Sequence, residues 1–411
     1  MAWQRWLCCA VVVVAVGCDS GAARFRLNEA YIQKNSSEEA PFSATQKQDI
    51  VDILAAMFGS PDVPTLPPAG EIDLDSIVDL DKLQLASGPV VTTASGRTQG
   101  LYRQHCVHCH GITGDGAGPT AAFLNPYPRD YRMGVFKFKG TPKGYRPNHD
   151  DLKRILVNGI PGTAMPSFRL LADDELDALV HYVKYLAIRG QVERKLIEQT
   201  ATELDGPESR LETSKEYLLE EVVAPVLTAW AEADGMAKAV AQRTPTWTEL
   251  SAEDRQASVA AGRELFYGPI ANCVKCHGNT QLGDGQTTDF DDWYKDFHDP
   301  TKEPNAAVNQ QKANSFVALG GLQPRNIKPR NLRDGSYRGG RRYVDLYWRI
   351  INGIDGTPMP GAPMKPEGAA ADAQGLTPDD VWHLVDYVLS LPNETLSNPR
   401  ANVPVYQRER M

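Results

Sequence analysis

The chain has 411 residues, of which 42% are hydrophobic and 23% charged, as is typical of a globular protein with room for two or three domains. Its formal net charge is −9 and its pI is near 5.5, so nucleic acids and anionic membrane surfaces would repel it. These properties argue against nucleic acid as a partner and favour other proteins.

The first residues have the pattern of an export signal. Residues 1–17 carry one early arginine, Arg5, and an apolar run that is short for a membrane span. The sequence Ala15-Val16-Gly17-Cys18 resembles a bacterial lipobox, which implies cleavage before Cys18 and lipidation of its thiol. We therefore expect a lipoprotein anchored on the periplasmic side of a bacterial membrane. An uncleaved anchor helix and a plain signal peptide are the alternatives.

Residues 18–86 are expected to form an N-terminal extension and spacer. One amphipathic helix is predicted at about 45–58. The stretch after it contains Pro64, Pro67 and Pro68, which favour extended backbone.

The four cysteines that follow the export segment form two Cys-x-x-Cys-His motifs. The first is Cys106-Val107-His108-Cys109-His110 and the second is Cys273-Val274-Lys275-Cys276-His277. This is the haem c attachment signature, in which two thiols bond to the porphyrin and the adjacent histidine binds the iron. A thioredoxin-type pair and half of a zinc site are the alternatives, and neither requires that histidine. The motifs predict two covalently bound haem c groups, with His110 and His277 as proximal iron ligands.

Both motifs belong to an internal repeat. Each is followed by a Gly-Asp-Gly turn, at 114–116 in the first copy and at 283–285 in the second. Further along, the sequence Pro-Arg-Asp-Tyr-Arg at 128–132 matches Pro-Arg-Asn-Leu-Arg at 329–333. The arginine after each proline, Arg129 or Arg330, could pair with haem propionates or be an ordinary surface residue.

The strongest correspondence within the repeat is a nonapeptide. Asn-Gly-Ile-Pro-Gly-Thr-Ala-Met-Pro at 158–166 and Asn-Gly-Ile-Asp-Gly-Thr-Pro-Met-Pro at 352–360 are identical at seven of nine positions. Both halves of the chain resemble class I cytochrome c domains. In that family a methionine in a Gly/Pro-rich loop supplies the sixth iron ligand, and the resemblance assigns this role to Met165 and Met359. Met364 on the same loop competes with Met359.

Helix signals surround these motifs in both copies. A helix should precede each Cys-x-x-Cys-His motif, most clearly at 251–266, where Ser251 can cap the first turn. A short helix should end at each Asn-Gly, with the glycine as its C-terminal cap. Closing helices are expected at 175–187 and 380–391, each with an apolar stripe that packs across the opening helix.

The expected fold is all-α, with two tandem class I cytochrome c domains joined by a helical linker. The linker has apolar residues spaced for one buried face, and it could set the haem separation or form a docking surface. The second domain has extra residues between Asp289 and Gln323, predicted to be a solvated loop with buried rings; covering a haem edge and binding a partner are the alternatives. The expected boundaries are 1–17 for the signal peptide, 18–86 for the extension and spacer, 87–190 for domain 1, 191–248 for the linker, 249–395 for domain 2 and 396–411 for a C-terminal tail.

Two sites with one ligand pattern and no spare coordination position indicate an electron carrier rather than an enzyme. The first repeat also resembles cytochrome subunits of quinol-oxidising and terminal-oxidase complexes, which implies redox proteins of this kind as partners near a respiratory chain. The main alternative is a dihaem peroxidase, in which one iron must open a position for peroxide. The matching methionine loops favour two closed sites.

Overall fold

The computed structural model describes residues 22–36, 40–92, 94, 96, 98–236, 243, 245–370 and 372–401. The expected signal peptide and Cys18 lie outside these ranges. Within them the chain is mostly helical, with one two-stranded hairpin, so the predicted fold class is confirmed. No helix in the described part combines the length and the apolar character needed to cross a membrane.

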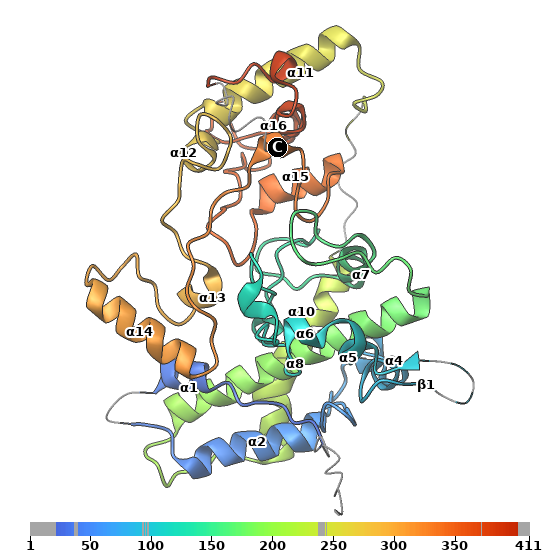
Figure 1. The fold of residues 1–411 in the computed structure, drawn as a ribbon, viewed down its shortest axis with the longest axis vertical. Coiled ribbons are helices and arrows are strands. Elements are labelled where there is room, and N and C mark those ends of the chain that lie inside the picture. Colours follow the sequence, from blue (N-terminus) through green and yellow to red (C-terminus); the bar gives the residue numbers. More distant parts are fainter. Residues whose placement is uncertain are drawn as a thin grey trace, which may run out of the picture.

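The helices gather into two lobes stacked along the long axis of the molecule (Figure 1). Each lobe has its own apolar core, one formed by residues between Tyr31 and Trp230 and one by residues between Val259 and Leu391. The helices of the first lobe are α1 (Glu29–Asn35), α2 (Ala44–Phe58), α3 (Leu74–Ile77), α4 (Leu80–Ala86), α5 (Leu101–His105), α6 (Val107–His110), α7 (His149–Asn158), α8 (Asp173–Glu203), α9 (Lys215–Tyr217) and α10 (Ala224–Gly235).

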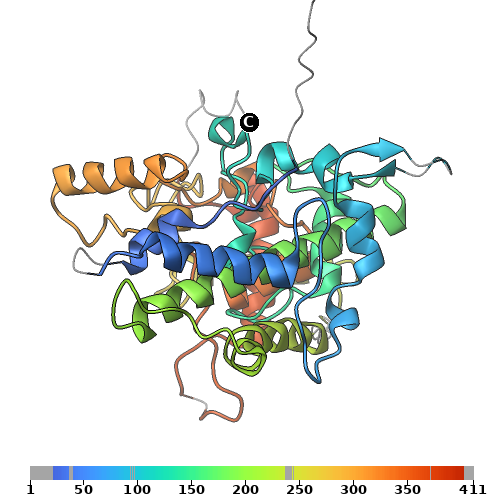
Figure 2. The same cartoon turned by 90° about the horizontal axis from the view of Figure 1, so that it is seen from below.

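Helix α8 is the scaffold of the first lobe, and α1, α2, α4 and α7 pack against it. Figure 2 shows the blue helix α2 lying in front of the green α8. The sequence predicts this closing helix at 175–187, whereas it continues to Glu203. The reason is that Val192, Leu196 and Ile197 are fully buried and extend the apolar face beneath α2. The expected linker therefore begins as part of α8, and its later apolar residues join the same core through α10.

The entry to the first haem motif differs from the single predicted helix. Helix α4 ends at Ser87-Gly88-Pro89, and a hairpin of β1 (Val91–Thr92) and β2 (Thr98–Gln99) leads into the short helix α5. Gly100 starts α5 with a φ of +76°, and a Cβ atom there would lie 2.4 Å from the Pro89 carbonyl oxygen. This close approach turns the chain back toward the motif, and only glycine allows it.

The second lobe is built on two crossing helices, α11 (Ala252–Tyr267) and α16 (Pro378–Ser390). Ser251 caps α11 by accepting a hydrogen bond from the amide of Asp254, as predicted. A Cβ atom at Gly262 would lie 1.9 Å from the carbonyl oxygen of His383, so glycine lets the two helices touch. The remaining elements of this part of the chain are α12 (Val274–His277), α13 (Asp292–Lys295), α14 (Ala306–Ala318), α15 (Tyr343–Asn352) and α17 (Glu394–Ser397).

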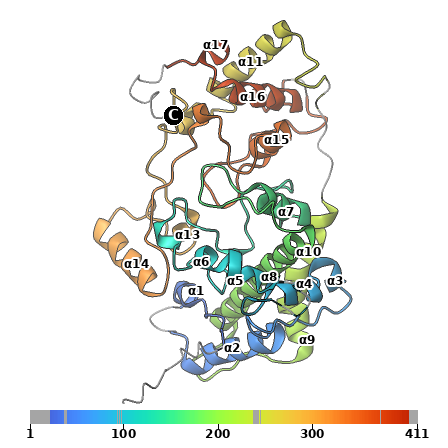
Figure 3. The same cartoon turned by 45° about the vertical axis from the view of Figure 1, so that its right-hand side comes forward.

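The extra residues of the second domain form an arm that lies on the first lobe. The arm carries α13 and α14, and α14 lies beside α1 (Figure 3). A separate apolar cluster joins Ala30 of α1 to residues of the arm, namely Trp293, Tyr294, Ala313 and Phe316. The predicted buried rings are therefore present, but the segment is not a solvated loop, because it forms α13 and α14 and packs against the other domain.

Polar contacts fix this arm along its length. Asp296 forms ion pairs with Arg194 of α8 at 3.0 Å and with Lys34 of α1 at 3.4 Å. Arg325 donates to the Ala122 carbonyl oxygen at 2.6 Å and stacks on the ring of Tyr127. These contacts hold the arm of the second domain against the first lobe.

We expect the arm to stabilise the whole protein through Trp293, which is 7% exposed. Truncating a buried tryptophan leaves a large cavity, so Trp293→Ala should lower the free energy of unfolding by about 3–5 kcal/mol. Phe123→Ala is the matched control, because this ring is 86% exposed and its loss should change stability by less than about 0.5 kcal/mol. Chemical denaturation measures both, and equal effects of the two substitutions would show that the arm does not pack as described.

Candidate haem sites

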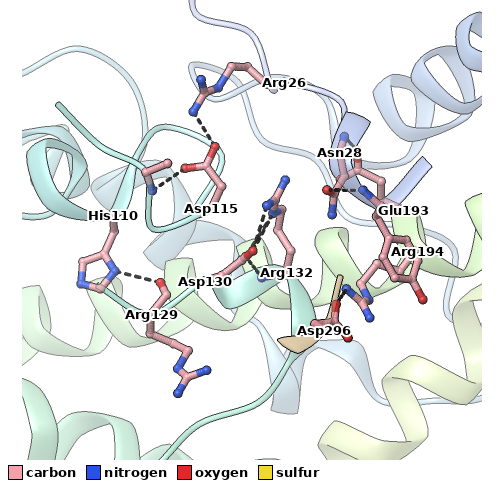
Figure 4. Close-up of polar contacts among 12 residues, drawn as sticks. Arg26, Asn28, His110, Asp115, Arg129, Asp130, Arg132, Glu193, Arg194 and Asp296 are labelled. Carbon is pink, nitrogen blue, oxygen red and sulfur yellow. Dashed lines mark hydrogen bonds and ion pairs between the residues drawn. The ribbon is translucent and has the colours of Figure 1, made fainter. Parts of the chain in front are cut away.

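The proximal side of the first site is organised around His110 at the end of α6. Its Nδ1 atom lies 3.2 Å from the carbonyl oxygen of Arg129 (Figure 4). A carbonyl only accepts, so Nδ1 carries the proton and Nε2 keeps a free electron pair. The ring of Tyr131 stacks on the imidazole with centroids 4.7 Å apart. Together these contacts hold one nitrogen of His110 ready to bind a metal.

Burial lowers the pKa of His110 to about 4, although the Arg129 carbonyl acts in the opposite direction. The imidazole is therefore neutral near pH 7, which is the form that binds iron. The amide of Gly116 donates to the His110 carbonyl at 2.9 Å, and the indole of Trp293 covers this glycine. The arm of the second domain thus closes over the loop that fixes His110.

The N-terminal segment also covers this loop. Arg26 forms an ion pair with Asp115 at 2.6 Å, and its amide donates to Thr113 (Figure 4). Asp115 in turn accepts from the amide of Ala117 at 3.0 Å. The expected extension is therefore more than a spacer, because it packs against the first haem motif.

The four motif cysteines are unpaired thiols in the structure. In the first motif Cys106 is buried, and Cys109 lies 3.4 Å from the hydroxyl of Thr120. Burial raises the pKa of Cys106 and of Cys273 to about 12. Two neighbouring thiols beside a neutral histidine, repeated in a second motif, fit covalent haem c better than a disulfide or a zinc site.

The second proximal site has the same backbone with a different lining. His277 ends α12, and burial lowers its pKa to about 4, with the Arg330 carbonyl acting in the opposite direction. The Arg330 carbonyl is near its buried Nδ1 atom but outside ordinary hydrogen-bond geometry, unlike the Arg129 carbonyl at His110. Leu332 occupies the position of Tyr131 in the second site, so an aliphatic side chain replaces the ring that stacks on His110.

The two Gly-Asp-Gly triplets differ in backbone register, which corrects the repeat alignment, although Asp115 and Asp284 both lie against the glycine that follows the motif histidine. The amide that donates to the carbonyl of the motif histidine belongs to Gly116 in the first copy and to Gly283 in the second. Gln281, with a φ of +58°, therefore takes the place of Gly114. The Gly114 carbonyl accepts from the amide of Tyr131, and the Gln281 carbonyl accepts from the amide of Leu332. The buried side-chain amide of Gln281 donates to the Asn279 carbonyl, which helps to hold the left-handed backbone conformation of Gln281.

The distal loops carry the same hydrogen bonds in both copies. The amide of Ile160 donates to the Met165 carbonyl at 3.1 Å, and the amide of Ile354 donates to the Met359 carbonyl at the same distance. The threonine hydroxyl of each loop accepts from the methionine amide, at 3.1 Å in the first loop and 3.2 Å in the second. Met165 and Met359 therefore have the same backbone hydrogen bonds in their two loops.

Helices α7 and α15 deliver these loops, and both end at the predicted Asn-Gly. Gly159 and Gly353 have φ values of +64° and +70°, as expected of C-terminal caps. A Cβ atom at Gly353 would lie 2.6 Å from the Met359 carbonyl oxygen, so glycine is required for the loop to fold back on the helix.

Met364, the competitor of Met359, lies outside the repeated loop geometry. It forms a bridge with Leu376 and packs against the core of the second domain. The amide of Lys365 donates to the Leu376 carbonyl at 2.9 Å and holds this arrangement. Met364 is partly buried against the core of the second domain, as Met165 is against the core of the first, so its place outside the repeated loop is what separates it from Met359.

Several residues at the sites carried no recognised sequence signal. Tyr131 stacks on His110, and Trp293 reaches the first site from the second domain. Arg330, which the repeat had marked as a propionate candidate, donates to the Ser336 carbonyl and lies against Gly162 of the first distal loop. In the second domain, Arg349 is partly buried, donates to the Gly340 carbonyl at 3.2 Å and lies over the ring of Phe138.

Comparison with known proteins agrees with this geometry. Residues 94–183 match the family described as cytochrome c oxidase, cbb3-type, subunit III, and residues 259–392 match the family described as cytochrome c. The chain is a dihaem c-type cytochrome with two cytochrome c domains in tandem. Both predicted haem c groups are confirmed by these matches.

A solved structure is also similar to this cytochrome. It belongs to the reducing HAO-like protein complex of Kuenenia stuttgartiensis, with 24% sequence identity, coverage of 74% of this chain and 98% of that chain, and a TM-score of 0.42. No curated protein sequence matches the chain at a significant level.

Proposed function

We propose that this cytochrome carries electrons between redox proteins and that each of its irons is closed by one histidine and one methionine. Haem iron supplies one-electron redox chemistry when it is bound. The observation that carries the proposal is the pair of distal loops with identical hydrogen bonds, ending at Met165 and Met359. The proximal ligands are His110 and His277, and the attachment residues are Cys106, Cys109, Cys273 and Cys276.

The protein's own residues keep both sites rigid and shielded. A thioether needs no deprotonation, and a loop braced by its threonine and glycines holds it without large rearrangement. Burial keeps both histidines neutral, and the Arg129 carbonyl orients the ring of His110. A carrier benefits from such rigidity because little has to move when its charge changes.

Location and partners follow from the same features. Haem c attachment and the lipobox resemblance favour a protein on the periplasmic side of a bacterial membrane, held there through lipidated Cys18. The match of the first domain to a terminal-oxidase subunit family supports a role within or next to a respiratory complex, with quinol-oxidising or oxidase subunits as partners. Such transient electron-transfer interfaces bury little surface.

Substitution of the two competing methionines tests the second distal ligand. Met359→Ala should lower the reduction potential of one haem and admit carbon monoxide to its reduced iron, because methionine ligation favours the ferrous state. Met364→Ala should leave both potentials nearly unchanged, since this side chain lies outside the repeated loop geometry. Spectroelectrochemical titration separates the two haems, and the reverse pattern would assign the ligand to Met364.

The lipid anchor is tested at Cys18. Cys18→Ser should release the haem protein into the soluble periplasmic fraction, because a short signal-like stretch is a poor permanent anchor. Fractionation of washed membranes with haem staining measures the distribution. Retention of the variant in the membranes would contradict lipidation as the cause of attachment.

A further inference from the structure

The two distal loops differ at only two positions, and one difference meets the other domain. Pro161 of the first loop corresponds to Asp355 of the second, and Ala164 corresponds to Pro358. The carboxylate of Asp355 points into the first domain, where it pairs with the ammonium of Lys139 at 3.0 Å. It also accepts from the backbone amide of Gly144 at 3.1 Å.

These partners form a cationic socket of the first domain, made by Lys139, Gly144 and Arg146. The side chains of Lys139 and Asp355 are 5% and 11% exposed, so the pair is largely removed from water. Lys139 also donates to the Thr141 carbonyl at 3.3 Å and to that of Pro142, which anchors it in its own turn. Burial lowers the pKa of Arg146, and the Asp355 carboxylate opposes this change, so Arg146 belongs to the socket electrostatically.

Neighbouring contacts make the interface continuous. Asn352, at the end of α15, donates to the Thr141 carbonyl at 3.4 Å. The ring of Phe138 packs on Gly339, where a Cβ atom would lie 2.4 Å from it, and the guanidinium of Arg349 lies over the same ring. The socket therefore sits at the edge of a packed surface.

We propose that Asp355 is a positioning residue that holds the second distal loop closed through the socket of the first domain. Axial closure of the second haem then depends on docking of the first domain, whereas the first loop, with Pro161 at this position, has no equivalent carboxylate. A buried ion pair suits this task because removing either partner leaves the other charge uncompensated. The inference rests on the proposed role of Met359 as the distal ligand.

Two substitutions in the dihaem protein test this contact with opposite changes in charge. Asp355→Pro gives the second loop the residue of the first, removing a negative charge, and Lys139→Met removes a positive charge. A direct electrostatic effect on the second haem would have opposite signs in the two variants, while loss of positioning has the same sign in both. Pro358→Ala is the matched control, because it changes the other differing position without touching the socket.

Two readouts follow the contact and its consequence. Hydrogen exchange of the Gly144 amide reports the contact directly and should accelerate by at least about tenfold in Asp355→Pro and Lys139→Met. Binding of cyanide to the oxidised second haem should become faster in both, since the loop opens more often. Pro358→Ala should leave the Gly144 exchange rate at that of the unsubstituted protein.

Several results would overturn the inference. Unchanged Gly144 exchange in Asp355→Pro would mean that the contact does not form. Faster exchange with unchanged cyanide binding, or changes of opposite sign in the two charge variants, would mean that it does not position the loop. Asp355→Asn preserves the shape of the side chain and replaces Asp355→Pro if that variant folds poorly, and Lys139→Gln replaces Lys139→Met in the same way. Failure of the Met359 assignment can be distinguished from failure of this inference. If Met359 is not the ligand, Met359→Ala would leave the binding of added cyanide and carbon monoxide to both haems unchanged.

Discussion

One backbone hydrogen bond, from the isoleucine amide to the methionine carbonyl, closes each distal loop, and the haem sites depend on it. It spans 3.1 Å in both copies and brings the methionine back over the end of α7 or α15. The positive φ of Gly159 and Gly353 makes that return possible, and the threonine hydroxyl fixes the methionine amide. On the proposed assignment of Met165 and Met359, a thioether is a weak ligand, so a preset backbone matters more than it would for a histidine.

The second domain serves the first as well as its own haem. Its arm lays Trp293 on the loop of His110 and ties Asp296 to α8, while its distal loop sends Asp355 into the first domain. Arg330 connects the two sites more directly, since its carbonyl acts on His277 and its guanidinium lies on Gly162. The repeat has therefore diverged where the domains meet, and the hydrogen bonds of its distal loops have stayed the same.

Local signals in the sequence were sufficient for the elements that depend on neighbouring residues. The Cys-x-x-Cys-His motifs, the Asn-Gly caps and the Ser251 cap act over a few residues and were predictable. The continuation of α8 to Glu203 could not be predicted, because its C-terminal half is buried by contacts with α2, which is distant in sequence. The sequence aligns the two Gly-Asp-Gly triplets because their residues are identical. The backbone alignment differs, because Gln281 adopts the left-handed conformation that Gly114 has in the first copy. Asp355 was visible as a mismatch between two loops, but its partner Lys139 is known only from the fold.

The central claim is that both irons are closed on both faces and that the protein passes electrons without a small-molecule substrate. The most direct test adds hydrogen peroxide and carbon monoxide to the oxidised, half-reduced and fully reduced protein while the haem spectra are recorded. Half-reduction matters because a dihaem peroxidase can open its site in that state. The account predicts that both haems stay low-spin in every state, with no turnover of peroxide and no rapid binding of carbon monoxide. A haem that becomes high-spin on half-reduction and consumes peroxide at enzymatic rates would contradict it and identify a peroxidase.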